Sequence, residues 1–228
     1  MHRKEQADMT AFFDLDKTLL DVNSGSQWLR YEFAAGRVTV WQTVQAIAWL
    51  SIYHFLAADM TRPLRMAMKD LKGLKETILV ARSDDFYAAR MLGRVRPGAH
   101  EALKRHRERG DKLVLLTSST VYVAREVSRE LGLDGYLATR LAVDGNGILT
   151  GEPVEPICFG EGKVVLAKRY LDEHGGSLED SIFYSDSYTD LPMMLAAGKA
   201  VAVNPDPKLR KEAARQGWEI CDWGRSGY

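Results

Sequence analysis

The stretch Phe12-Phe13-Asp14-Leu15-Asp16-Lys17-Thr18-Leu19-Leu20 decides the fold, because an apolar run ends there in two carboxylates one residue apart. If residues 10–15 form a buried strand, Asp14 and Asp16 lie at its carboxyl end, where open α/β sheets bind ligands. Two like charges at that place repel each other unless a cation lies between them or one carboxyl stays protonated. Mg²⁺, a hard cation that commonly accompanies phosphate, suits the pair. Taken alone, the pair also fits an Asx turn or a helix cap.

The composition is that of an ordinary globular protein. With 228 residues, the chain is long enough for one sizeable domain or for a domain with an insertion. Lys+Arg and Asp+Glu are equal at 31 each, so no overall basic field favours a nucleic-acid partner. Cys158 and Cys221 lie far apart without metal-ligand spacing. We expect buried or half-buried thiols in a reducing compartment.

Two segments bear on the cellular location. The first nine residues are polar and lack the apolar core of a secretory signal, so we expect a cytoplasmic protein with a frayed N-terminal tail. Residues 38–58 contain no Asp, Glu, Lys or Arg and approach the length of a membrane span. Polar residues interrupt this stretch, which favours a buried or self-associating helix over a membrane-surface helix or a true span.

The order of elements predicts an α/β protein with a helical insertion. Residues 22–95 show only helical patterns, with helices expected at 24–35, 38–58, 61–73 and 75–92. Helices and strands alternate from residue 96 onward. The expected strands are 112–116, 136–143, 148–154, 181–184, 200–203 and 218–221, separated by helices at 99–109, 121–131, 162–173, 191–197 and after 204–207. This alternation predicts a doubly wound, mostly parallel, Rossmann-like sheet from residues 1–21 and 96–228, with 22–95 as an all-helical cap.

Three further groups of polar residues lie at the ends of expected strands or beside them. Thr117 and Ser118 follow a strand and precede a helix, which is typical of a phosphate-binding nest or of a plain N-cap. Asp186 and Asp190 form a second acidic pair after another strand, as metal ligands or as parts of a capped turn. Lys163 begins a helix, where the helix dipole does not favour a cation. Lys163 is either a cation that offsets the negative charge of the site or an ordinary solvated lysine.

These sites together supply a nucleophile, a general acid, hydrogen-bond donors to phosphate, a cation that offsets negative charge, and metal ligands. That is the minimum set for phosphoryl transfer through an aspartyl-phosphate. From Ala11 onward the chain resembles the haloacid dehalogenase superfamily phosphatases of the phosphoserine-phosphatase-like subfamily, in which a helical cap lies between the first and second motifs. The four motifs stand here, in order, as Asp14-Leu15-Asp16-Lys17-Thr18-Leu19, Thr117, Lys163 and Tyr184-Ser185-Asp186-Ser187-Tyr188-Thr189-Asp190.

The resemblance implies a catalytic role for each motif. Asp14 would attack phosphorus and become the aspartyl-phosphate. Asp16 would protonate the leaving alkoxide and then deprotonate the water that hydrolyses the intermediate. Thr117, Ser118 and the backbone N–H groups that follow would hold phosphate oxygens, while Lys163 would offset the negative charge of the nucleophile and the phosphoryl group.

The resemblance also implies a Mg²⁺ site and a small phosphorylated metabolite as the substrate. The ion would be held by the Asp14 carboxylate, the Asp16 backbone carbonyl and the Asp186 carboxylate, with Asp190 in support. We expect the cap to recognise the substrate, and the candidate side chains for substrate recognition are Tyr31, Arg62 and Arg65.

The chain departs from the phosphoserine phosphatases proper at positions that concern the substrate. Residues 22–26 contain no counterpart of the cap glutamate that reads the amino acid group in those enzymes. Ser118-Ser119 replace two glycines of the second motif, and Ser187 and Thr189 replace a glycine and an asparagine of the fourth. The segment from Pro156-Ile157-Cys158-Phe159 through Leu191-Pro192 is closer to a branch that includes histidinol-phosphate phosphatases and members of unassigned substrate.

The sequence thus predicts a cytoplasmic, Mg²⁺-dependent phosphomonoesterase, with phosphoserine and histidinol phosphate as candidate substrates. A phosphotransferase that passes the phosphoryl group to a second alcohol would use the same residues. A non-catalytic or membrane-associated binding protein on the same fold predicts a lost nucleophile or acid, whereas Asp14 and Asp16 are both present. The uncharged residues 38–58 are compatible with that alternative and with the association of copies through the cap.

Overall fold

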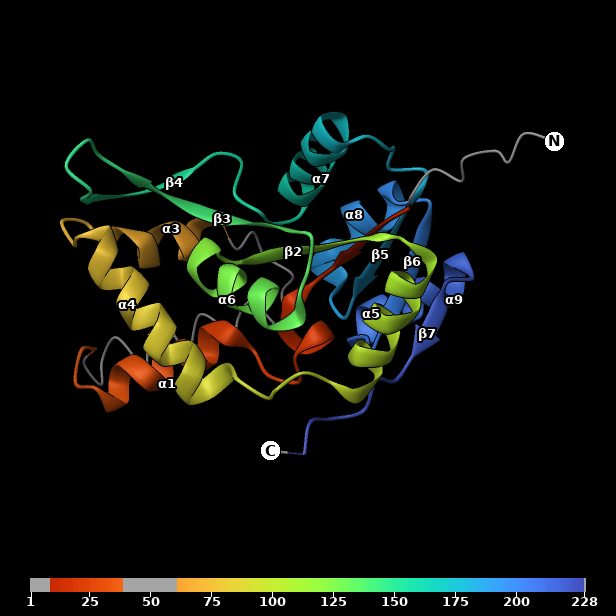
Figure 1. Cartoon of the computed structure of the whole chain (residues 1–228), viewed down its shortest axis with the longest axis horizontal. Helices are drawn as coiled ribbons and strands as arrows, with labels where there is room; N and C mark the ends of the chain where they lie inside the picture. Colours follow the sequence, from red (N-terminus) through yellow and green to blue (C-terminus); the bar gives the residue numbers. More distant parts are fainter. Residues whose placement is uncertain (1–8, 39–60, 228) are drawn as a thin grey trace.

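The computed structural model describes residues 9–38 and 61–227, and a twisted sheet lies at the centre of this part of the chain (Figure 1). Its seven strands follow the order β4-β3-β2-β1-β5-β6-β7. Neighbouring strands are parallel except β3 and β4, which form the expected antiparallel hairpin. The strands are β1 (Thr10–Phe13), β2 (Lys112–Thr120), β3 (Gly135–Val143), β4 (Leu149–Val154), β5 (Ser181–Ser185), β6 (Lys199–Val203) and β7 (Glu219–Cys221).

Helices connect the parallel strands and cover both faces of the sheet. Within the described residues they are α1 (Ser24–Ala34), α3 (Thr61–Lys69), α4 (Glu76–Phe86), α5 (Pro97–Arg109), α6 (Val121–Leu131), α7 (Glu161–His174), α8 (Leu191–Ala196) and α9 (Pro207–Gln216). Short helical turns cover Tyr87–Met91 and Tyr188–Asp190, and Leu15–Leu19 forms a tight turn. The predicted doubly wound, mostly parallel α/β fold is confirmed.

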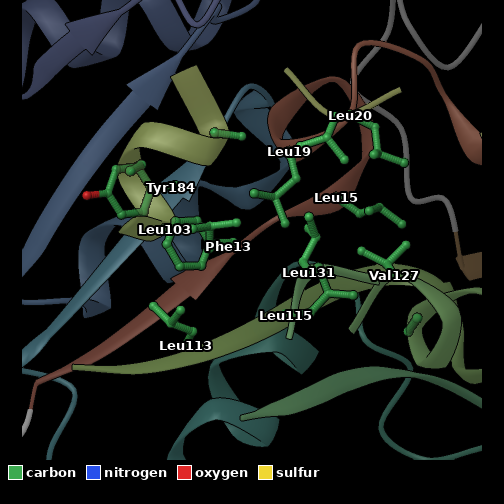
Figure 2. Close-up of a cluster of buried hydrophobic side chains, with 14 of the residues drawn as sticks. Phe13, Leu15, Leu19, Leu20, Leu103, Leu113, Leu115, Val127, Leu131 and Tyr184 are labelled. Carbon is green, nitrogen blue, oxygen red and sulfur yellow. The ribbon is translucent and has the colours of Figure 1, made fainter. Parts of the chain in front are cut away.

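Each face of the sheet has its own apolar core, because side chains along a strand point alternately to opposite faces. Phe13, Leu115 and Tyr184 belong to the core on the face covered by α5 and α6, where Figure 2 shows them beside side chains from these helices. Phe12 and Phe183 belong to the core on the other face, to which α7, α8 and α9 contribute. The central strand β1 is therefore buried on both sides.

The helices α1, α3 and α4 lie together at one end of the molecule, away from β6 and β7 (Figure 1). A third apolar cluster packs Met68 of α3 and Leu79 of α4 against Tyr122 of α6 and against Leu141 and Leu149 of the hairpin. The β3–β4 hairpin thus supports the helical region as well as ending the sheet.

The limits of the helical cap stay a prediction. An isolated antiparallel bridge joins Leu20 to Val95, beside the two points at which the chain is expected to leave and re-enter the core. Apart from Val38, the uncharged residues 38–58 lie outside the described residues. Among residues 9–38 and 61–227, no helix is both long enough and apolar enough to cross a bilayer.

Several elements differ in length from the expectation, and α3, for example, ends at Lys69 instead of continuing to residue 73. β2 continues to Thr120 instead of ending at Leu116, because Thr120 still pairs with Thr139 of β3 after a shift in register. The helix expected over 75–92 is α4 followed by a wider turn over Tyr87–Met91, in which a backbone N–H reaches back five residues.

Both cysteines carry free thiols, and their burial agrees with the prediction. Cys158 is buried and Cys221 is half-buried. Burial raises the pKa of Cys158 to about 12, so this thiol is protonated and unreactive at neutral pH.

Candidate active site

The chain turns sharply after β1, and this turn carries the first acidic pair. β1 ends at Phe13 rather than at Leu15, because Leu15–Leu19 forms a tight turn, with Asp16 extended and Lys17 left-handed, instead of continuing the strand. Lys17 adopts a left-handed backbone conformation with φ of 58°, which is uncommon for a residue with a side chain. Its N–H donates to the carbonyl oxygen of Val22 at 3.0 Å, so the turn closes on itself.

Asp14 is anchored at the carboxyl end of the central strand. Its N–H donates to the carbonyl oxygen of Tyr184 in β5 at 2.9 Å. Its Oδ1 accepts a hydrogen bond from Lys163 Nζ at 2.7 Å, and the same ammonium donates to Asp190 Oδ2 at 2.7 Å. Lys163 is 1% exposed, so the alternative of a solvated lysine is wrong. This lysine instead bridges two buried carboxylates.

Burial controls the charges of this cluster. Burial raises the pKa of Asp14 to about 7, although the nearby Lys163 lowers it. Burial, together with the neighbouring charges of Asp14 and Asp190, holds the pKa of Asp186 well above its usual range. Burial also opposes the charge of Lys163, but the two carboxylates outweigh it and raise the lysine pKa. Asp14, Asp186 and Asp190 are therefore three buried carboxyl groups beside one buried ammonium, which contacts Asp14 and Asp190, and the exposed Lys17 lowers the pKa of Asp186.

Two hydroxyl groups hold the acidic residues in place. Thr18 Oγ1 lies 3.4 Å from Asp14 Oδ2 and 3.4 Å from Asp186 Oδ1, and it accepts the Asp186 N–H at 2.9 Å. Ser185 Oγ donates to Asp190 Oδ2 at 2.7 Å. Sequence reasoning assigned no role to Thr18 or Ser185, although both stand inside motifs that it identified.

Asp16 is held by the start of α1. The N–H of Ser24 donates to Asp16 Oδ1 at 2.7 Å, the Ser24 hydroxyl donates to Oδ2 at 2.8 Å, and Asn23 Nδ2 donates to Oδ2 at 3.4 Å. Burial raises the pKa of Asp16, and the two donors of Ser24 oppose that rise. Asn23 is the N-cap of α1, because its Oδ1 accepts the Ser26 N–H at 2.9 Å.

The residues after the buried part of β2 lie against the start of α1. Thr117 is fully buried, and its Oγ1 accepts the Ser119 N–H at 3.1 Å. The carbonyl oxygen of Ser118 accepts the Thr139 hydroxyl at 3.0 Å. Ser119 Oγ lies 2.8 Å from Ser24 Oγ. Because β2 is the parallel neighbour of β1, these residues are at the same edge of the sheet as the acidic cluster.

The described contacts of the cap candidates do not involve the acidic cluster. Arg65 forms an ion pair with Glu155, which follows β4. Tyr31 packs against Phe86 with a ring-centroid distance of 5.6 Å. The side chain of Arg62 lies outside the described residues. A substrate-reading role for these three residues stays a prediction.

Gly162 allows α7 to bring Lys163 to the acidic cluster. A Cβ atom at this position would lie 1.9 Å from the carbonyl oxygen of Ile157. Only glycine permits so close an approach of the helix to the segment before it. The sequence contains the signal as Gly160-Glu161-Gly162, but the pattern alone does not say which backbone comes near.

The expected magnesium ligands lie together at the ends of β1 and β5. In residues 9–38 and 61–227, no three His, Cys, Asp or Glu side chains gather as a metal-ligand cluster. The expected set needs only the carboxylates of Asp14 and Asp186 and the backbone carbonyl of Asp16, and Mg²⁺ commonly keeps several waters. Both carboxylates contact Thr18, and their negative charge is only partly offset by Lys163. A divalent cation fits this arrangement.

We expect Gly162→Ala to lower both stability and any activity that depends on Lys163, because the added methyl group must push α7 away from Ile157. Strain of this kind typically costs about 1–3 kcal/mol of unfolding free energy, measurable by urea denaturation. Gly25→Ala is the matched control, since its Cβ would meet only Asn23 Oδ1 at an ordinary 3.5 Å. If Gly162→Ala unfolded like the control, the close approach would be wrong.

Proteins of known family resemble this chain over most of its length. A family model described as haloacid dehalogenase-like hydrolase matches residues 11–195. Phosphoserine phosphatase SerB1 of Mycobacterium tuberculosis H37Rv is 32% identical over 228 residues, which cover 97% of this chain and 73% of that protein. Histidinol-phosphatase of Neisseria meningitidis serogroup C is 28% identical over 217 residues, which cover 93% of this chain and 98% of that protein.

The fold is shared with a solved structure as well. A protein of unknown function from Bordetella pertussis Tohama I has a TM-score of 0.85 and 27% sequence identity, covering 96% of this chain and 100% of that one. The chain therefore belongs to the haloacid dehalogenase-like hydrolase family and is a phosphatase-type enzyme of its phosphoserine-phosphatase-like branch.

Proposed function

We propose that the chain is a Mg²⁺-dependent phosphomonoester hydrolase, which acts on a small phosphorylated metabolite through an aspartyl-phosphate at Asp14. The observation that carries this proposal is the buried bridge between Lys163 Nζ and Asp14 Oδ1 at 2.7 Å. A fixed ammonium beside the nucleophile orients the carboxylate and offsets the repulsion between it and an anionic phosphate.

In the first half-reaction, a carboxylate oxygen of Asp14 attacks phosphorus and forms a new P–O bond. The bond between phosphorus and the ester oxygen breaks, and the proton of Asp16 passes to the leaving alkoxide. The raised pKa of Asp16 supports this role, because burial favours the protonated carboxyl that a general acid needs.

In the second half-reaction, a water oxygen attacks the phosphorus of the intermediate while the ionised Asp16 takes a proton from that water. The P–O bond to Asp14 breaks, inorganic phosphate leaves, and the carboxylate of Asp14 is restored. One monoester and one water thus give one alcohol and one phosphate, and Asp16 is again protonated.

We assign the phosphate oxygens to Lys163, Thr117, Ser118 and the backbone N–H groups that follow. The Thr117 hydroxyl accepts the Ser119 N–H, so it keeps its own hydrogen for donation to a phosphate oxygen. Such donors, fixed before the substrate arrives, stabilise charge on the transferring phosphoryl group.

We assign Mg²⁺ to the carboxylates of Asp14 and Asp186 and to the backbone carbonyl of Asp16. Asp190 supports the site through its ion pair with Lys163 at 2.7 Å. When bound, Mg²⁺ would supply positive charge that favours the ionised carboxylates and offsets the charge on phosphoryl oxygens.

The substrate is proposed as a class. Relatives named phosphoserine phosphatase and histidinol-phosphatase make phosphoserine and histidinol phosphate the first candidates. Asn23, in the stretch that lacks a carboxylate, uses its amide to cap α1 and to contact Asp16. We therefore favour a monoester that is not recognised through a carboxylate in residues 22–26.

Phosphate release from a metabolite panel that includes both candidates, and from 4-nitrophenyl phosphate, tests the proposal. We expect Mg²⁺-dependent turnover by the wild type and a loss of more than about 10³-fold in Asp14→Asn, because an amide does not attack phosphorus. Asp172→Asn, at an exposed position of α7, is the control and should retain activity. Turnover that persists in a folded Asp14→Asn variant would exclude Asp14 as the nucleophile.

We expect Asp186→Asn to raise the Mg²⁺ concentration that gives half-maximal activity by at least about tenfold, since it removes a carboxylate ligand. The thermal unfolding midpoint provides a second readout without substrate. MgCl₂ should raise this midpoint in the wild type and in Asp172→Asn, and less in Asp186→Asn, because ligands that bind the folded state stabilise it. Equal Mg²⁺ dependence in all three proteins would contradict the assigned site.

A further inference from the structure

Ser24 gives Asp16 two hydrogen bonds from a single residue. Its backbone N–H donates to Asp16 Oδ1 at 2.7 Å and its hydroxyl donates to Oδ2 at 2.8 Å. A carboxylate held at both oxygens has a fixed plane, which one hydrogen bond alone does not provide. Ser24 is 3% exposed, so water competes little for these contacts.

The Ser24 hydroxyl also contacts the segment that follows β2. Ser24 Oγ lies 2.8 Å from Ser119 Oγ, and either hydroxyl can be the donor. Ser24 therefore joins the turn after β1 and the start of α1 to the end of β2, where Ser119 lies 95 residues further along the chain. Ser24 thus hydrogen-bonds both Asp16 and the 117–120 segment.

The backbone explains why Ser24 reaches Asp16. The hydrogen bond from the Lys17 N–H to the carbonyl oxygen of Val22 closes the turn and returns the chain to its start. Asn23 then caps α1 by accepting the Ser26 N–H, so the N–H of Ser24 has no partner within the helix and donates to Asp16 instead. The first turn of α1 thus places both donors of Ser24 on one carboxyl group.

A serine hydroxyl suits both protonation states of this carboxyl. A hydroxyl has one donor and two acceptor sites, so it can donate to an ionised carboxylate or accept from a protonated carboxyl. When Ser24 donates to Asp16, Ser119 can donate to Ser24, and when Ser24 accepts from Asp16, it can donate to Ser119. The serine pair can therefore hold the ionised carboxylate, and also the protonated carboxyl until its proton turns to the leaving group, when Ser24 can again donate to Asp16.

We propose that Ser24 is a positioning residue for Asp16, which it holds, with the help of Ser119, in the orientation needed for proton transfer to the leaving group. This inference rests on the proposed function, in which Asp16 is the general acid. Because α1 belongs to the expected cap, Ser24 also makes the orientation of the acid depend on the docking of α1 against the core.

The basicity of the leaving group separates this role from a merely structural one. Phenyl phosphate and 4-nitrophenyl phosphate have similar shapes, but the nitrophenolate leaves with far less help from a proton donor. The ratio of their kcat/KM values is also independent of the fraction of folded enzyme. We expect Ser24→Ala to lower kcat/KM about tenfold or more for phenyl phosphate and less than about threefold for 4-nitrophenyl phosphate, since general acid catalysis contributes about 10²–10⁴-fold.

Three further variants sharpen the test. Ser24→Thr keeps the hydroxyl and should retain most of the kcat/KM that Ser24→Ala loses. Ser119→Ala should lower kcat/KM less than Ser24→Ala does, and again more for phenyl phosphate than for 4-nitrophenyl phosphate. Asp16→Asn should show the same leaving-group dependence in a stronger form. Ser26→Ala is the matched control on the same turn of α1, because its hydroxyl donates to the carbonyl oxygen of Asn23 and makes no described contact with Asp16.

Each outcome has a distinct meaning. A loss in Ser24→Ala that falls mainly on phenyl phosphate, with rescue by Ser24→Thr, supports the inference. Equal losses on the two esters, or no loss on either, would overturn the role of Ser24 while leaving the proposed function intact. A wild-type enzyme that hydrolyses neither these esters nor any member of the metabolite panel with Mg²⁺ would overturn the proposed function and this inference with it.

Discussion

The buried ammonium of Lys163 is the interaction on which the site depends. It binds the carboxylates of Asp14 and Asp190 at 2.7 Å each, with all three side chains withdrawn from water. An ion pair that loses one partner in such surroundings leaves an uncompensated buried charge, at a cost on the order of 3–5 kcal/mol. Asp186 adds a third buried carboxyl to this cluster, so its acidic groups exceed its basic ones. That excess makes the site suited to a divalent cation and an incoming group that the cation and the lysine can hold together.

The parallel sheet explains how residues so far apart in the sequence meet. β1 lies between β2 and β5, so the chain segments that follow these three strands emerge at one edge. α7 packs on the sheet face opposite to α5 and α6 and places Lys163 at this edge, whereas α1 places Ser24 there from the helical region. The proposed nucleophile Asp14 and its partner Lys163 thus lie on the sheet core, whereas the proposed proton donor Asp16 is held partly by the start of α1. Under the proposed mechanism, this division would make proton transfer, more than nucleophilic attack, sensitive to the helical region.

Much of the fold and the principal acidic and basic residues could be predicted from the sequence, and the rest could not for physical reasons. Asp14 and Asp186 follow apolar strand patterns directly, so the pattern that predicts each strand also predicts their place at its end. Thr117 follows the apolar part of β2, although the strand itself continues to Thr120. The contacts of Ser24 with Asp16 and of Gly162 with Ile157 depend on how separate segments approach each other, which no local pattern records. The sequence predicts a longer β1 because Leu15 continues the apolar run. Leu15 is buried, but it belongs to the tight turn that follows the strand.

The central claim is that Asp14 accepts the phosphoryl group, and the most direct measurement is to trap that acyl phosphate. The enzyme would be quenched during Mg²⁺-dependent turnover of 4-nitrophenyl phosphate and treated with borohydride, which reduces an aspartyl-phosphate to homoserine. Mass spectrometry of the peptide that contains Phe12-Phe13-Asp14 would then locate the change. Our account predicts homoserine at position 14 and at no other aspartate, only when substrate is present. Unmodified Asp14 in an enzyme that is actively turning over, or homoserine at Asp16 instead, would contradict it.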